Sequence, residues 1–144
     1  MTDFYTQFSM GFDVTPEEAA WLEETYADPE WPWRGKHNSE DDKGFMMEIY
    51  PRSPHDLAKL HYWAHGTVYD GPESLAIFLQ NFLNRFRPEG ILSFAYADTC
   101  SKPVEDGFGG GGVVITAQEI WWFHAGDQVS NKMKQLQAQV LESE

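Results

Sequence analysis

Basic residues are scarce in this chain: its 144 residues include ten Lys and Arg against 23 Asp and Glu, for a formal net charge of −13. A field of that sign repels nucleic-acid phosphates and anionic lipids, and it attracts basic surfaces. The composition therefore disfavours direct binding to DNA, RNA or a membrane, and it favours a basic surface on a partner protein. Solubility alone would also account for such a charge.

Cysteine is equally scarce. Cys100 is the only one, which excludes an internal disulfide and leaves nothing that indicates an oxidising compartment. No run approaches the 18 or so apolar residues of a membrane span, and the first residues lack the basic and apolar regions of a secretory signal. We therefore expect a cytoplasmic protein.

Large apolar side chains, in contrast, are plentiful. Hydrophobic residues make up 42% of the chain and aromatic residues 15%, a composition that argues against intrinsic disorder. A chain of this length buries enough surface for one core, and it shows neither an internal repeat nor a linker. We expect residues 1–144 to form a single domain.

Apolar periodicity predicts alternating strands and helices along the chain. The clearest pattern is a helical stripe over residues 72–86, in which Leu79 and Phe82 should be almost fully buried. Thr15 and Glu18 have the spacing of a capping box, which predicts an earlier helix that runs to about residue 26. The other predicted elements are strands over 4–14, 44–50, 60–68, 91–97 and within 113–124, and a final helix over 127–141.

Several connections decide the strand count. Pro51 should end the second strand, and residues 54–59 should form either a wide connection or one helical turn. Residues 98–112 should be a loop, and residues 113–124 should form either two strands or one bent ribbon. The resulting order, β-α-β-β-α-β-β-α, predicts an α+β fold. Its mostly antiparallel sheet would have about five strands, with the helices packed on one face.

The final predicted helix carries a narrow apolar stripe, formed by Val129, Met133, Leu136 and Val140. Such a stripe either packs on the sheet or pairs with a second copy of itself. A seam of two heptads is short for a coiled coil. We therefore expect the helix to pack on the sheet and the protein to be a monomer.

A glycine-rich segment extends from Thr99 to Gly112, with Cys100 and Lys102 near its start. Glycines let a ligand or another backbone approach closely, so the segment is a candidate ligand or enzyme site. In a phosphate-binding loop, however, the glycines lead into a helix, whereas these lead into the β-branched run Val113–Thr116. A structural connection between two strands is therefore favoured.

Other side chains are weaker candidates for chemistry. His61 and His65, with His55 or Asp56 as a third ligand, could bind a metal, but no Glu follows the first His as in the His-Glu-x-x-His pattern. Cys100 would need an activating base, and no catalytic signature supplies one. We assign no catalytic residue, metal or cofactor, and we expect a protein that is not an enzyme.

Acidic residues cluster in the N-terminal third of the chain, where Trp31 and Trp33 lie in a predicted acidic loop. A one-sided acidic surface suits a basic partner, and Trp residues in polar loops are typical of interface anchors. A solvated helix face, with loops that fold back on the sheet, would show the same pattern. The candidate partner-binding residues are Glu17, Glu23, Glu24, Glu30, Trp31, Trp33, Asp41 and Asp42.

Residues 94–116 contain the pattern YADTCSKP over 96–103, followed by FGGG over 108–111. This segment resembles small uncharacterised proteins of bacteriophages and plasmids. The resemblance implies a mobile element in a bacterial host cell, and it brings no known activity or catalytic residue.

Mobile elements commonly encode small acidic proteins that block host nucleases, whose DNA channels are rich in Lys and Arg. The sequence therefore predicts an acidic, DNA-mimicking inhibitor that binds a host nucleic-acid-handling defence complex, of the anti-CRISPR or anti-restriction type. The alternative is a small ligand-binding protein or enzyme that uses the segment from Thr99 to Gly112.

Overall fold

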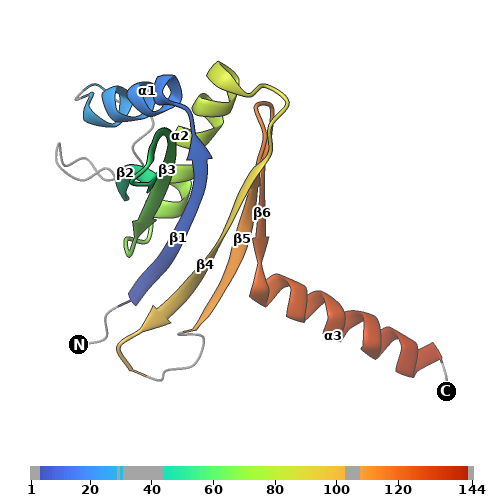
Figure 1. The fold of residues 1–144 in the computed structure, drawn as a ribbon. Coiled ribbons are helices and arrows are strands. Elements are labelled where there is room, and N and C mark those ends of the chain that lie inside the picture. The colour runs from blue at the N-terminus through green and yellow to red at the C-terminus, as the bar shows by residue number, and fades with distance from the viewer. Residues whose placement is uncertain (1–3, 29, 31–43, 103–107, 143–144) are drawn as a thin grey trace.

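The fold is given by a computed structural model that describes residues 4–28, 30, 44–102 and 108–142 (Figure 1). As predicted, this part of the chain forms an α+β fold, with one strand more than expected. In chain order, the elements are β1 (Phe4–Val14), α1 (Pro16–Ala27), β2 (Met46–Ser53), β3 (Asp56–Gly66), α2 (Gly71–Phe86), β4 (Leu92–Cys100), β5 (Gly109–Ile115), β6 (Ile120–His124) and α3 (Ala125–Glu142).

The six strands form one antiparallel sheet in the order β2-β3-β1-β4-β5-β6. The first four strands with α1 and α2 make a βαββαβ unit of the split βαβ type, in which β1 separates the two strands that α2 connects. Strands β5 and β6 then extend the sheet beyond β4. Since many unrelated functions occur on such a unit, the topology by itself assigns none.

The core lies between one face of the sheet and helices α1 and α2. In α2, the side chains of Leu75, Phe78, Leu79, Phe82 and Leu83 are fully buried at helical spacing, which confirms the burial predicted for Leu79 and Phe82. They pack against alternate residues of the strands, because successive side chains of a strand point to opposite faces. The opposite face of the sheet has no helix on it in the described part of the chain.

The capping box predicted for α1 is present. The hydroxyl of Thr15 accepts a hydrogen bond from the backbone amide of Glu18 at 3.2 Å, and Glu18 Oε1 accepts one from the amide of Thr15 at 2.9 Å. The same carboxylate accepts a hydrogen bond from Arg87 Nε at 2.8 Å. One buried carboxylate thus fixes the start of α1 to the end of α2.

Pro51 does not end β2, contrary to the prediction. β2 is an edge strand that pairs only with β3, and an edge strand tolerates proline because one of its sides makes no ladder hydrogen bonds. The strand continues to Ser53, which pairs with Asp56 across a two-residue turn. Both connections predicted for residues 54–59 are therefore wrong, since β3 already begins at Asp56.

The predicted loop over 98–112 is also strand at both ends. β4 continues to Cys100 and β5 begins at Gly109, with Asp98 opposite Gly109 in the register. Pairing with β4 along the whole run, and with β6 at Gly111 and Gly112, holds the glycines in the sheet despite their low strand preference. A turn, closed by a 2.9 Å hydrogen bond from the amide of Thr116 to the carbonyl of Glu119, separates β5 from β6. The residues 113–124 therefore form two strands.

Helix α3 does not pack on the sheet, and that prediction is wrong. The helix follows β6 directly, and Figure 1 shows it leaving the sheet and pointing away from it. None of its described side chains is buried; those of Val129, Met133 and Leu136 are between 47% and 61% exposed. Only α1 and α2 pack on the predicted face. None of the described helices is long and apolar enough to cross a membrane.

Candidate functional site: an acidic, aromatic pocket beside α2

A pocket of about 530 Å³ opens between the first turns of α2 and strands β1, β4 and β6. It lies on the face that the helices cover, next to the junction of β6 with α3. The residues of its wall that can recognise a ligand are Tyr69, Glu73, Tyr96, Asp98, Trp122 and His124. They come from segments far apart in the sequence, which the sheet order brings together.

The contact between Tyr96 and His124 in the pocket wall depends on Gly111. The register places Gly111 directly between Tyr96 of β4 and His124 of β6. Because glycine has no side chain, the flanking side chains meet across β5, and the Tyr96 hydroxyl lies 2.6 Å from Nδ1 of His124. A Cβ at Gly111 would lie 2.9 Å from that hydroxyl and would overlap the carbonyl oxygen of Phe123. The glycine run therefore makes room for this pair.

Carboxylates give the pocket its charge. Asp98 accepts a 2.8 Å hydrogen bond from the hydroxyl of Thr6, which holds its side chain in place on the wall. Asp70 and Glu73 lie at the start of α2, where the positive end of the helix dipole stabilises acidic groups. No Lys or Arg is among the described residues that line the pocket. Its charged groups are therefore of one sign, apart from His124 when protonated.

Aromatic rings form much of the remaining wall. The rings of Tyr96 and Trp122 meet edge to face at a centroid distance of 6.2 Å. Tyr69 stands on the turn before α2 and is 79% exposed, so its ring is open to a ligand at the rim. Aromatic faces beside carboxylates are the groups that bind a desolvated cation, because the ring quadrupole and the negative charge attract it together.

The environment of Tyr96 keeps its side chain neutral. Burial raises the pKa of the Tyr96 phenol, and the negative charges of Asp98 and Asp127 add to this effect. The protonated hydroxyl can donate to a neutral His124, or it can accept from Nδ1 when that nitrogen carries the proton. The hydrogen bond therefore persists in either form of the imidazole.

The predicted partner-binding residues lie elsewhere. Glu17, Glu23 and Glu24 are on the exposed side of α1, and Glu30 is exposed just beyond its end. Figure 1 shows α1 at the opposite end of the sheet from the β6–α3 junction, so the structure does not bring these groups to the pocket. Trp31, Trp33, Asp41 and Asp42 lie outside the described residues.

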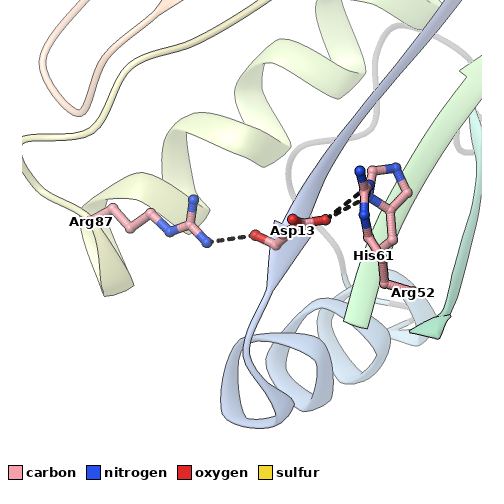
Figure 2. Close-up of polar contacts among 4 residues, drawn as sticks. All are labelled: Asp13, Arg52, His61 and Arg87. Carbon is pink, nitrogen blue, oxygen red and sulfur yellow. Dashed lines mark hydrogen bonds and ion pairs between the residues drawn. The ribbon is translucent and has the colours of Figure 1, made fainter. Parts of the chain in front are cut away.

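A second polar cluster surrounds Asp13 near the end of β1, with His61 and Arg52 on one side of the strand and Arg87 on the other (Figure 2). Oδ1 of Asp13 is 2.9 Å from Nδ1 of His61 and 3.3 Å from a guanidinium nitrogen of Arg52, while Arg87 donates to the backbone carbonyl of Asp13 at 2.8 Å. The hydrogen bond with His61 lowers the pKa of Asp13. Gly11, which has no Cβ, leaves space for the His61 ring. We interpret this cluster as structural, since its hydrogen bonds connect β1 with β2 and β3 and its residues do not line the pocket beside α2.

The histidines considered for a metal site have different partners. His61 contacts Asp13, and the ring of His65 stacks on Trp63 at a centroid distance of 4.0 Å. In the described ranges, no three His, Cys, Asp or Glu residues are grouped so that they could hold a metal ion. Cys100, at the end of β4, is half-buried and donates to the carbonyl of Lys102.

Sequence reasoning missed the residues that form the pocket. Tyr96 and His124 are 28 positions apart, and only the register of β4, β5 and β6 shows that they meet. The one available signal was the glycine run itself, because a glycine inside a strand often marks a close approach of other groups. No family model, curated protein or solved structure matches this chain.

Proposed function

We propose that this chain is a binding protein for a basic protein surface, and that the pocket beside α2 accepts a Lys or Arg side chain of the partner. The observation that supports this most is the composition of the wall. Its described residues include Glu73 and Asp98 beside aromatic rings, and no Lys or Arg. A cation leaving water needs both kinds of group to offset its desolvation.

The charge of the whole chain supports the same partner. A net charge of −13 raises the rate at which a basic surface is encountered, and the effect declines as salt shortens the Debye length. Glu17, Glu23 and Glu24, exposed on α1, contribute to this field. In this proposal the acidic surface steers the partner, and the pocket provides the specific contact.

The specific form of the proposal is an inhibitor encoded by a mobile element. The partner would be a host complex that handles DNA or RNA, such as a CRISPR or restriction effector, whose channel is lined with Lys and Arg. An acidic domain competes for such a channel because it presents negative charge where phosphates bind. The resemblance of residues 94–116 to phage and plasmid proteins supports this form.

A small ligand-binding protein or enzyme is the second candidate, and the Tyr96–His124 pair favours it. A hydrogen-bonded phenol and imidazole at the wall of a pocket could transfer a proton to or from a small molecule. This candidate makes Tyr96 indispensable for turnover. Cation binding, in contrast, needs only the ring of Tyr96, so that Tyr96→Phe should retain it.

The test is a titration of the protein with the peptide Gly-Arg-Gly-Arg-Gly, followed by NMR. We expect Asp98→Asn to raise the dissociation constant by about fivefold or more, which corresponds to about 1 kcal/mol. Asn preserves the acceptor for Thr6, so the change removes charge and little else. Glu119→Gln is the matched control, because it removes the same charge from an exposed turn outside the pocket. Equal effects of the two variants would contradict a role of the pocket.

A further inference from the structure

Helix α3 exposes an apolar stripe that nothing in the described part of the chain covers. The helix has 18 residues and no buried side chain. Val129, Met133 and Leu136, which lie on one side at spacings of four and three, are 61%, 56% and 47% exposed. In proteins, most of the stability of a helix comes from packing an apolar face, and little from propensity alone. A stable α3 therefore requires a contact along this stripe.

The charge of α3 differs from that of the remaining chain. Its two acidic residues, Asp127 and Glu142, are balanced by Lys132 and Lys134, so the whole net charge of −13 lies outside the helix. The positions that flank the stripe in a heptad are Ser130, Lys132, Gln137 and Gln139, and none of these is a carboxylate. A strongly basic partner would find no complementary charge on this helix. A second neutral helix with the same stripe meets no repulsion there.

We propose that α3 pairs antiparallel with α3 of a second copy of the chain, with Val129 opposite Val140 and Met133 opposite Leu136. The spacing of four, three and four is that of a coiled-coil seam, and it is self-complementary about a two-fold axis. This dimer is independent of the function proposed for the pocket. It replaces the expectation of a monomer, which rested on α3 packing on its own sheet.

Electrostatics selects the antiparallel direction. A helix of 18 residues is about 27 Å long. In an antiparallel pair the two acidic bodies are attached at opposite ends, separated by several Debye lengths of about 8 Å each. A parallel pair would place both bodies at the same end, where two chains of charge −13 repel one another. Antiparallel pairing also aligns the helix dipoles favourably.

The seam is only two heptads long, so the dimer should dissociate on dilution. Exposed Trp121 and Phe123 of β6 lie just before the helix, near the point where the C-terminal turn of the partner helix arrives. Their apolar surface can extend the contact beyond the seam. We expect an equilibrium between monomer and dimer within the micromolar range.

Sedimentation equilibrium of the full chain from about 1 to 100 µM tests the proposal. We expect a mass that rises toward two chains, and a mass of one chain at every concentration for Leu136→Glu. Ile91→Glu is the matched control: it adds the same charge in place of a side chain that is 69% exposed outside α3, and it should dimerise like the wild type. Circular dichroism should show less helix in Leu136→Glu, with the near-ultraviolet signal of the core retained.

The direction of pairing is measured with a spin label on the thiol that Asp127→Cys introduces, in a Cys100→Ser background. Antiparallel pairing places the two labelled positions about 22 Å apart along the helix axis, whereas parallel pairing places them about 10 Å apart. A wild-type chain that stays monomeric at 100 µM or binds only a different protein through α3 overturns the proposal. So does a dimer that survives Leu136→Glu, or a label distance near 10 Å.

Discussion

Tyr96 and His124 are two strands apart in the sheet, yet the hydroxyl of Tyr96 lies 2.6 Å from Nδ1 of His124 because Gly111 stands between them without a side chain. The pair occupies the wall of the pocket, beside Asp98 and Trp122. The glycines at 109–112, which belong to the segment that the sequence offers as a candidate loop, are thus part of strand β5, and the missing side chain of Gly111 makes room for the site.

Replacement of Gly111 by Ala should therefore separate the pair. The new Cβ would overlap the carbonyl oxygen of Phe123, so β6 must shift, and overpacking of this kind costs about 1–3 kcal/mol. Gly112→Ala is the control, because its Cβ would meet only the carbonyl oxygen of Phe94, at 3.4 Å. Urea unfolding measures the free energy of unfolding of both variants. An equal loss of stability in the two variants would contradict the role given to Gly111.

The ion pair between Glu18 and Arg87 should make stability depend on acid pH. Burial raises the pKa of Glu18, but hydrogen bonds from Arg87 and from the Thr15 amide outweigh it, and the pKa falls below the usual 4.5. A carboxyl with a lowered folded pKa stabilises the fold above its unfolded pKa, and this contribution is lost as pH falls through the folded value.

Glu18→Gln, which can still form the capping box, should cost about 1–2 kcal/mol at pH 7, since Arg87 is partly exposed. The difference from the wild type should shrink as pH falls from the usual carboxyl pKa through the lowered folded pKa of Glu18, and it should be absent once the carboxyl is protonated in both states. Glu17→Gln removes the same charge from an exposed position of the same helical turn and should change little. Urea unfolding from pH 3 to pH 7 provides the comparison. If the free energies of unfolding of the wild type and Glu18→Gln differ by the same amount at every pH in that range, the charge of Glu18 is not the cause of the difference.

Tyr62 offers the opposite kind of prediction, a gain in stability. Its side chain is fully buried, and its hydroxyl has no hydrogen-bond partner among the described residues. An unsatisfied buried hydroxyl costs free energy. Tyr62→Phe should therefore raise the free energy of unfolding by about 1 kcal/mol, as seen by thermal or urea unfolding. A loss of more than about 1 kcal/mol would mean that the hydroxyl has a partner.

Charge reversal on α1 should act on the rate of association with a basic partner. The probe is a candidate host effector whose nucleic-acid channel is lined with Lys and Arg. The double variant Glu23→Lys, Glu24→Lys should associate with this effector more slowly, and its dissociation should change less. The slowing should diminish as salt rises through the physiological range. Lys102→Ala and Cys100→Ala should change neither rate. Surface plasmon resonance at two salt concentrations measures the association and dissociation rates. A change in the dissociation rate alone would contradict steering by α1.

Local patterns were sufficient for much of the fold. The stripe that includes Leu79 and Phe82 defines α2, and the spacing of Thr15 and Glu18 defines the start of α1, because each depends on residues within a few turns of one another. The prediction that Pro51 ends β2 was wrong because the free-energy cost of proline in a strand depends on whether the strand is central or at an edge of the sheet. That distinction is a property of the assembled sheet.

The candidate site depends on features that no short window contains. Tyr96, Gly111 and His124 come together only through the pairing of three strands. The arrangement of α3 was mispredicted for a related reason, because an apolar stripe indicates that a helix is covered without indicating what covers it. For the pocket and for α3 alike, the sequence does not show which residues of another element lie next to the ones considered.

The most direct test of cation binding in the pocket compares two peptides that differ in charge alone. Gly-Arg-Gly-Arg-Gly and its citrulline counterpart have nearly the same shape, but citrulline is neutral. We expect the ring resonances of Tyr69, Tyr96 and Trp122, observed by NMR, to shift with the arginine peptide and to stay unchanged with the citrulline peptide. Equal shifts with both peptides, or shifts confined to α1 and the open face of the sheet, would contradict a pocket that recognises a cation.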